Sequence, residues 1–225
     1  MIRLHQYPAI PGFSSLSPFC MKVEAFLKHN QLPYQVVTEL SPLRGPKGKM
    51  PFIEMEEETI TDSSFILSWL ESRFGIPRSV SPEGHAIQKM VEENLYWVIL
   101  HSRWGSPEGW QYVRNQFSVL FPWRLGAVAL PLIRRRLLRE LYIQGIGRHS
   151  SEEIYAIGKS DIDCLSSFLG SKPYFLGDCW TALDATTYSF IKLILEAPYS
   201  NPLKEAGREH KNLVNYCNRL DIDLQ

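Results

Sequence analysis

One change of pattern constrains the fold of this 225-residue chain more than any other feature. Up to residue 75, strand signals alternate with helical periodicity, whereas only helical patterns follow the linker 76–84. The first part predicts strand, helix, strand, hairpin and helix at residues 3–7, 18–30, 34–38, 51–61 and 62–74. Strands joined by a helix pair in parallel, so this order predicts a small α/β domain over 1–76. An all-helical domain is predicted over 85–225, with helices at 85–104, 108–120, 127–145, 151–169, 182–196 and 208–220.

The composition excludes several classes of protein. Lys and Arg together number 24, as do Asp and Glu, so the net charge is zero and a nucleic-acid partner, which needs basic patches, is not expected. The four cysteines form no CxxC pair and the six histidines lack ligand spacing, so we expect neither a disulfide framework nor a metal site. The N-terminus lacks the apolar core of a signal peptide, and reduced thiols are usual in the cytoplasm, so a cytoplasmic protein is expected.

The most apolar stretch, residues 117–133, is short for a bilayer span and contains Pro122, Pro131 and Arg124. Three arginines follow at 134–136. This segment, up to residue 141, has three interpretations: a cover over a hydrophobic substrate pocket, a membrane-surface helix with basic anchors, or a core helix with a solvated basic end. We favour the core helix over membrane contact.

The tetrapeptide 17-SPFC-20 lies where a loop leads from the first predicted strand into a helix. Backbone N–H groups and a partial positive charge at a helix N-terminus stabilise a thiolate. A dithiol oxidoreductase would have cysteines at both ends of the tetrapeptide, but the first position is Ser17. Its hydroxyl can donate to a ligand's thiolate, which predicts thiol activation rather than disulfide chemistry. The structural alternative is that Ser17 only caps the helix and that Cys20 is a small core residue.

Pro51 lies at the start of a predicted strand, directly after Lys49 and Met50. A proline there cannot donate to the sheet. In a thioredoxin fold, which the element order of the first domain resembles, a cis-proline at this place presents the preceding backbone to a peptide ligand. Met50 would then offer its N–H and C=O, while Lys49 could meet a carboxylate. Because proline is common at strand edges, this motif is weak evidence by itself.

Asp62 and Ser63 begin the next predicted helix. Ser63 and its backbone N–H would bind an anion at the helix N-terminus, and Asp62 would accept from an ammonium group. Plain helix capping is the alternative. Together, a thiol site, a backbone site and an amino-acid site match the cysteine, the peptide backbone and the γ-glutamyl end of glutathione.

Two serine- or threonine-led segments have the spacing of a capping box. They are Ser150 with Glu153, and Thr181 with Asp184 in place of the usual Glu. Both predict helix starts, and neither is expected to take part in catalysis.

Six segments carry a resemblance to a known family: 17-SPFCMKVEAFL-27, 33-PYQVV-37, 48-GKMPFIE-54, 60-ITDSSFILSWL-70, 144-QGIGRHSSEEI-154 and 175-FLGDCWTALDA-185. Through them the chain resembles the glutathione transferase superfamily, and within it the failed-axon-connections and metaxin branch. The resemblance implies a thioredoxin-like N-terminal domain, an all-helical C-terminal domain, glutathione as co-substrate and a homodimer. It also implies that Ser17 stabilises the glutathione thiolate, as the residue at this place does in serine- and cysteine-type transferases.

The resemblance leaves alternatives for the thiol chemistry. Tyrosine-type transferases use a tyrosine just after the first strand, where Tyr7 is the nearest match, although the intervening loop is longer here. A thioltransferase acting through Cys20 would lack its partner cysteine. Asp62 stands where many relatives have Glu or Gln, and its shorter side chain bears on how strongly the γ-glutamyl end is held.

The function that follows is conjugation of glutathione to a small hydrophobic electrophile, as in detoxification. Trp97, His101 and Trp104 fall on one face of a predicted helix and are candidates for the electrophile pocket, although an aromatic stripe is more often part of the core. Because metaxin-like proteins need not be enzymes, a non-catalytic binding or assembly protein is the alternative function.

Overall fold

A computed structural model describes residues 1–78, 81–118, 121 and 125–224, so Pro122 and Arg124 lie outside the described residues. The chain divides into two compact units. One unit consists of Met1–His85, Ser171–Leu193 and Asn215–Gln225, and the other of Ala86–Gly170 and Ile194–Val214. Neither unit is one continuous segment. The linear boundary expected between residues 76 and 85 stays a prediction.

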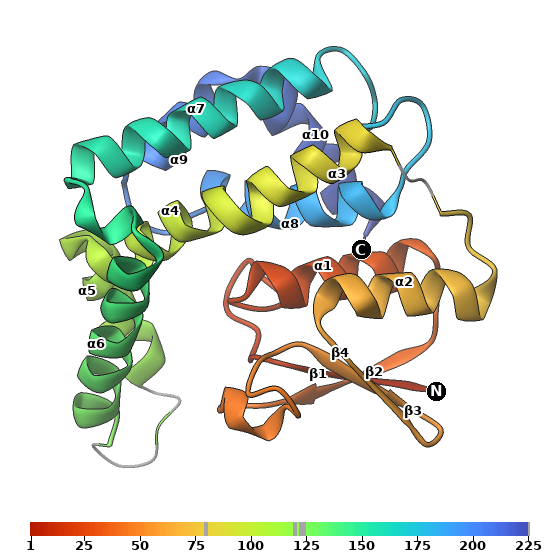
Figure 1. Cartoon of the computed structure of the whole chain (residues 1–225), viewed down its shortest axis with the longest axis horizontal. Helices are drawn as coiled ribbons and strands as arrows, with labels where there is room; N and C mark the ends of the chain where they lie inside the picture. The colour runs from red at the N-terminus through yellow and green to blue at the C-terminus, as the bar shows by residue number, and fades with distance from the viewer. Residues whose placement is uncertain (79–80, 119–120, 122–124, 225) are drawn as a thin grey trace. The chain divides into compact units, whose positions relative to one another are not determined.

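The first unit contains a four-stranded mixed sheet in the order β2-β1-β3-β4 (Figure 1). β1 (Ile2–Gln6) and β2 (Tyr34–Thr38) are parallel and are joined through α1 (Pro18–His29). β3 (Phe52–Met55) and β4 (Glu58–Thr61) form an antiparallel hairpin that pairs with β1. This topology confirms the thioredoxin-like prediction.

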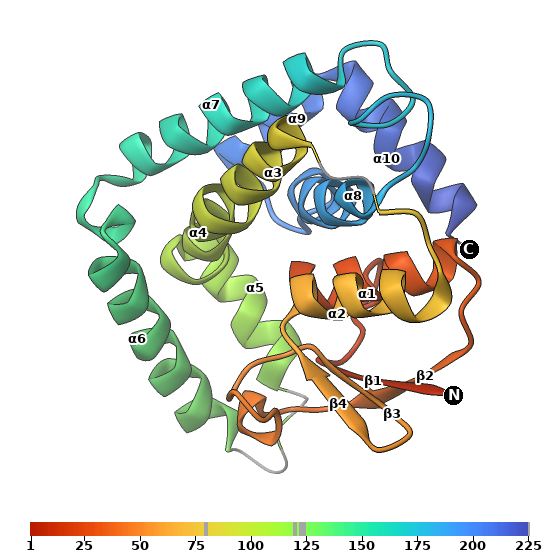
Figure 2. The same cartoon turned by 45° about the vertical axis from the view of Figure 1, so that its right-hand side comes forward.

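Two helices, α1 and α2 (Ser63–Phe74), lie side by side on one face of this sheet (Figure 2). Their apolar stripes supply the fully buried side chains Val23, Phe26, Leu27, Ile66 and Leu70. Burial of each such side chain stabilises the fold by about 1.5–3 kcal/mol. α2 ends at Gly75, whose φ of +64° is a left-handed conformation that glycine adopts without strain.

Segments from the C-terminal part of the chain complete the first unit. The ring of Trp180 stacks on His29 at a centroid distance of 3.8 Å, and Phe190 of α8 (Ala182–Leu195) meets Phe19 edge-on at 5.4 Å. Near the end of the chain, after α10 (Lys211–Asp223), the carbonyl of Leu224 accepts from Lys28 at 3.0 Å. These contacts explain why α1 is buried without interruption from Cys20 to Leu27.

The second part of the chain is helical in its described residues. Its elements are α3 (Pro82–Lys89), a π-helical segment Met90–Leu95, α4 (Tyr96–Leu100), a second π-helical segment His101–Gly105, α5 (Pro107–Phe117), α6 (Gly126–Gln144), a 3₁₀ turn Ile146–Arg148, α7 (Ser151–Leu169) and α9 (Pro202–Glu209). The stretch expected as one helix over 85–104 is thus helical, but its hydrogen bonding shifts from the α to the π pattern twice, at Met90–Leu95 and at His101–Gly105. The all-helical prediction is confirmed.

The helix expected over 208–220 is wrong at its start. A separate helix, α9, ends at Glu209, and α10 begins at Lys211. Asn201 caps α9 by accepting from the N–H of Lys204 at 3.0 Å, with Pro202 at the first helical position. This Asn–Pro pair is a helix-start signal that the periodicity analysis missed.

The two capping-box predictions have different outcomes. At α7, Ser150 accepts from the N–H of Glu153 at 3.3 Å and donates its own N–H to the Glu153 carboxylate at 2.8 Å, so this box is complete. At α8, the carboxylate of Asp184 accepts from both the N–H (2.9 Å) and the hydroxyl (3.0 Å) of Thr181. The threonine hydroxyl therefore donates rather than accepts, and only half of the expected box is present.

One face of α6 packs as the core-helix interpretation expects. Leu130 and Leu141 are buried. Arg134 donates to the carbonyl oxygens of Trp104 at 2.8 Å and Gly105 at 3.3 Å. Arg134 is thus a packed structural residue, which corrects its assignment to a solvated basic end.

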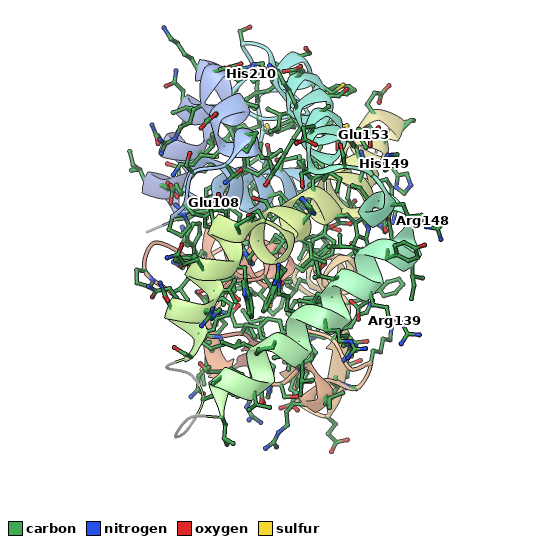
Figure 3. The ribbon with its side chains drawn as sticks, turned by 90° about the vertical axis from the view of Figure 1, so that its left-hand side faces the viewer. Glu108, Arg139, Arg148, His149, Glu153 and His210 are labelled. Atoms are coloured by element: carbon green, nitrogen blue, oxygen red, sulfur yellow. The ribbon has the colours of Figure 1, made fainter. Side chains whose placement is uncertain are left out.

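The other face of α6 is exposed. Val128, Leu132 and Ile143 are 64%, 62% and 64% exposed, and the neighbouring arginines at 135, 136 and 139 are exposed as well. Figure 3 shows Arg139 extending away from the ribbon of α6. The expectation that the apolar segment packs on its own domain is therefore wrong for this face. No helix among the described residues is long and apolar enough to cross a membrane.

Candidate functional site

Ser17 is the N-cap residue of α1 and has extended backbone angles (φ −97°, ψ 124°). Its carbonyl accepts from the N–H groups of Cys20 at 3.1 Å and Met21 at 3.0 Å, and so begins the helix. Its side chain makes no capping hydrogen bond. Ser17 therefore occupies the N-cap position, as the structural alternative expects, but its hydroxyl makes no capping hydrogen bond and lies beside the Cys20 thiol.

Cys20, one turn further on, has no exposed surface and packs with Met50, Phe52 and Tyr7. Burial raises the pKa of its thiol to about 11, although hydrogen bonds from the Tyr7 backbone and from the side chains of Ser17 and Ser15 oppose the shift. At pH 7 only about one such thiol in ten thousand is ionised. The geometry supports a packing role for Cys20 and gives no support to a thiolate reaction there.

Tyr7 follows β1 and is half-buried. Its carbonyl accepts from the hydroxyl of Ser15 at 3.2 Å, and its side chain packs against the cluster around Cys20. Tyr7 therefore lies near the start of α1, and its catalytic role stays an alternative prediction.

The loop before β3 brings a cis peptide bond, Met50–Pro51, to the same cluster. The Met50 side chain is buried against Cys20. Among the described residues, no group hydrogen-bonds to the backbone N–H or C=O of Met50. Lys49 is exposed and forms no ion pair within the described part of the chain. The loop thus presents one peptide donor, one peptide acceptor and one ammonium group.

Asp62 joins β4 to α2 with a positive φ of +75°, which is unusual for a residue with a side chain. One of its carboxylate oxygens accepts from the N–H of Ser64 at 3.0 Å. Such backbone strain persists where surrounding contacts hold it and is frequent at binding sites. The strained residue places its exposed carboxylate beside the first N–H groups of α2.

Ser63, the first residue of α2, is buried. Among the described residues its backbone N–H has no acceptor, and its hydroxyl is bonded only as the acceptor of a 3.4 Å hydrogen bond from Lys22. The residue therefore offers two donors at a helix N-terminus, the arrangement that binds anions.

Sequence reasoning missed Lys22. Its side chain is 1% exposed, and its ammonium donates to the hydroxyls of Ser63 at 3.4 Å and Ser64 at 3.0 Å. A signal was available, because Lys22 falls one turn before Phe26 on the apolar stripe of the predicted helix. A charged residue on such a stripe needs polar partners in the core.

Contacts join the three segments singled out in the first unit. Cys20 of α1 touches Met50 of the cis-proline loop, and Lys22 of α1 reaches Ser63 of α2. The N-terminal half of α1 therefore lies between the proposed backbone subsite and the proposed amino-acid subsite.

The aromatic candidates from the second part have different surroundings. Trp104 is buried, with ring contacts to Trp110 and Phe117. Trp97 is half-buried and contacts Tyr96. The ring of His101 is half-buried, and its Nε2 has no hydrogen-bond partner among the described residues. Burial lowers the pKa of His101, which favours the neutral imidazole. The proposed electrophile role of these residues stays a prediction.

The described residues contain no group of three or more His, Cys, Asp or Glu side chains placed to hold a metal ion.

Family models and relatives agree on one assignment. The model for the glutathione S-transferase N-terminal domain matches residues 18–109, and that for the C-terminal domain matches residues 158–220. The chain is 30% identical over 235 residues to the isoprene-epoxide–glutathione S-transferase of Rhodococcus sp. (strain AD45), with 98% of each chain covered. The chain belongs to the glutathione S-transferase family.

Other relatives have different names. The chain is 31% identical to Failed axon connections of Drosophila melanogaster, covering 98% of this chain but 57% of that protein. It is 23% identical to Metaxin-2 of Homo sapiens, covering 89% and 80% of the two chains. The resemblance to this branch, stated from the sequence, is confirmed.

Solved structures of the family have the same fold. The glutathione transferase of Phanerochaete chrysosporium superposes with a TM-score of 0.65 at 17% identity, covering 99% and 96% of the two chains. A glutathione S-transferase of Ceriporiopsis subvermispora, in complex with glutathione, gives 0.63 at 16% identity, covering 99% and 97%.

Proposed function

We propose that the protein binds glutathione in its first unit, stabilises the thiolate with the Ser17 hydroxyl, and conjugates it to a small hydrophobic electrophile. The observation that carries the proposal is the side chain of Ser17, which stands at the N-terminus of a 12-residue helix without capping it. Family membership and a relative named for glutathione transfer to an isoprene epoxide support the same reaction class.

The binding mode follows from donors and acceptors without protein partners. The Met50 N–H and C=O pair with the peptide backbone of glutathione, and Lys49 meets a carboxylate. Ser63 receives the γ-glutamyl carboxylate at the start of α2. Asp62 uses its remaining carboxylate oxygen to accept from the γ-glutamyl ammonium, since its other oxygen is held by Ser64.

The chemical step depends on the thiolate. A hydrogen bond from Ser17 and the partial positive charge at the start of α1 both favour the anion. Lowering a thiol pKa from about 8.5 toward neutrality raises the reactive fraction about tenfold or more at pH 7. The sulfur then bonds to the electrophilic carbon. With an epoxide, the C–O bond breaks and the oxygen takes a proton from water.

The proposed test combines binding and rate measurements. Titration calorimetry with millimolar glutathione should give a heat of binding with the folded wild type. The absence of this heat would contradict the proposal. With a small apolar epoxide as electrophile, Ser17→Ala should slow conjugation about ten- to a hundredfold at nearly unchanged glutathione affinity, because a hydrogen bond to a charged group is lost. If Tyr7→Phe loses the rate and Ser17→Ala does not, the mechanism is of the tyrosine type. If Cys20→Ser abolishes activity instead, the protein is a thioltransferase.

The second candidate is a non-catalytic binding or assembly protein. The similarity to Failed axon connections and Metaxin-2, whose names state no transferase reaction, favours it. Binding of glutathione without turnover of any electrophile tested would support this function. The homodimer and the cytoplasmic location stay predictions under both candidates.

A further inference from the structure

The connection between β1 and α1, residues 7–17, is longer than the about two to six residues that usually join a strand to a helix. Hydrogen bonds hold this loop in one arrangement. The backbones of Ile10 and Phe13 exchange hydrogen bonds of 3.0 and 2.9 Å, and the side-chain amide of Gln6 in β1 donates to the Ser14 carbonyl at 3.3 Å. The loop is therefore tied to the end of β1 before it reaches α1.

Ser15 makes a further tie, directly before the start of α1. The residue has no exposed surface, its hydroxyl donates to the Tyr7 carbonyl at 3.2 Å, and the N–H of Ser17 donates to the same hydroxyl oxygen at 3.4 Å. Because a serine hydroxyl has one proton, which here goes to the Tyr7 carbonyl, its oxygen accepts from Ser17. Serine side chains commonly accept in this way from the N–H two residues on. Ser15 thus connects the end of β1 to the N-cap residue of α1.

The two serine hydroxyls differ in what they bind. The hydroxyl of Ser15 is used within the loop, whereas the side chain of Ser17 makes no capping hydrogen bond. Both hydroxyls lie beside the thiol of Cys20, and burial raises the pKa of this thiol to about 11. A neutral thiol places no negative charge beside Ser17, so Cys20 does not compete with a bound thiolate for the Ser17 proton.

We propose that Ser15 is a positioning residue, which holds the Ser17 hydroxyl where the glutathione thiolate binds. This inference rests on the proposed function. Without the Ser15 hydroxyl, the Ser17 N–H and the Tyr7 carbonyl lose their shared partner, and the N-cap residue is free to shift relative to β1. A displacement of about 1 Å in a group that acts on the reacting atom costs up to about a hundredfold in rate.

The experiment measures the pH midpoint at which bound glutathione ionises, from the ultraviolet absorbance of its thiolate. In Ser15→Ala this midpoint should rise by about one pH unit, and conjugation to a small apolar epoxide at neutral pH should slow about tenfold. Glutathione affinity in calorimetry should change little, because the other proposed subsites are intact. Ser14→Ala, a half-buried serine in the same loop, is the matched control and should leave the midpoint unchanged.

A double-mutant cycle tests whether Ser15 acts through Ser17. Adding Ser15→Ala to Ser17→Ala should raise the midpoint no further, because no hydroxyl is left to position. If the two shifts add in full, Ser15 only supports the loop and the inference is wrong. A folded Ser15→Ala variant whose midpoint equals that of the wild type would overturn it as well.

Measurements on the wild type separate this inference from the proposal on which it rests. If the folded wild type binds no glutathione, or binds it with the midpoint of the free thiol, the proposed function fails and the inference fails with it. Hydrogen exchange does not depend on the folding of any variant. The Ser17 N–H should be protected from exchange, and rapid exchange there would contradict the role of Ser15 alone. Circular dichroism confirms that each variant is folded.

Discussion

At the residue scale, Asp161 is a carboxylate held in an unfavourable place. It is 8% exposed and accepts from Asn94 at 2.8 Å, but burial outweighs this bond and raises its pKa from 3.8 to about 6. Above pH 6 the folded chain therefore carries a buried carboxylate, which lowers its stability, and this penalty disappears as the pH falls from about 6 toward 4.

We expect Asp161→Asn to raise the free energy of unfolding by about 1–2 kcal/mol at pH 8, because a neutral amide avoids the buried charge. The gain should shrink at pH 5, where the wild-type carboxyl is already mostly protonated. Urea unfolding at both pH values measures the difference, and Asp178→Asn, at an exposed position, is the control. A gain that grows toward pH 5 would contradict the assignment.

The residues of the candidate site were predictable where a motif marks them. Ser17, Pro51 and Ser63 stand at strand–helix or loop–strand junctions, and junction geometry follows from the order of elements. Lys22 was not predicted, because its contacts depend on α2 lying beside α1. Its two partners on α2 follow it by 41 and 42 positions in the sequence, so the contacts are tertiary. The positive φ of Asp62 could not be predicted either, since residues with a side chain rarely adopt this conformation.

At the element scale, the start of α8 depends on one buried carboxylate. Asp184 has no exposed surface and accepts from the N–H of Phe175 (3.0 Å), the N–H and hydroxyl of Thr181, and the hydroxyl of Tyr216 (3.0 Å). The bonds fix the preceding loop to the helix and to α10. Burial raises the pKa of Asp184, against these hydrogen bonds.

We expect Asp184→Asn to lower the free energy of unfolding by about 3 kcal/mol, because the amide nitrogen cannot accept and leaves buried donors unsatisfied. Urea denaturation measures the loss. Tyr216→Phe removes one of the donors and should cost about 1 kcal/mol. If the two variants lose equal stability, the carboxylate is not the centre of this network.

The presence of the helices could be predicted from the periodicity of apolar residues, but their boundaries could not always be predicted. The run over 85–104 gives a helical pattern, and the shifts to π-helical hydrogen bonding at Met90–Leu95 and His101–Gly105 leave that pattern nearly unchanged. The sequence predicts the α6 helix, but not which of its faces is buried, because the helix carries apolar residues on most of its sides. Which of them are buried is decided by packing against other helices, as at Leu130 and Leu141.

At the scale of the whole molecule, the exposed face of α6 bears on whether the protein pairs with a second copy or binds to a membrane surface. Arg136 and Arg139 fall between Leu132 and Ile143 along the exposed face, so basic side chains interrupt its exposed apolar residues. A net charge of zero gives little general attraction to anionic lipid. Transferase-like folds commonly pair, and a two-fold contact needs only one self-complementary patch.

We therefore expect a homodimer that does not bind vesicles. Light scattering should give about twice the chain mass of 25.9 kDa, and the protein should stay in the supernatant when vesicles containing anionic lipid are pelleted. The informative variant is Arg135→Glu with Arg139→Glu, since both side chains are exposed. Arg134→Glu is unsuitable because Arg134 holds the Trp104 carbonyl. If the wild type pellets with vesicles and the double variant is released, α6 is a membrane-surface helix and the expectation is wrong.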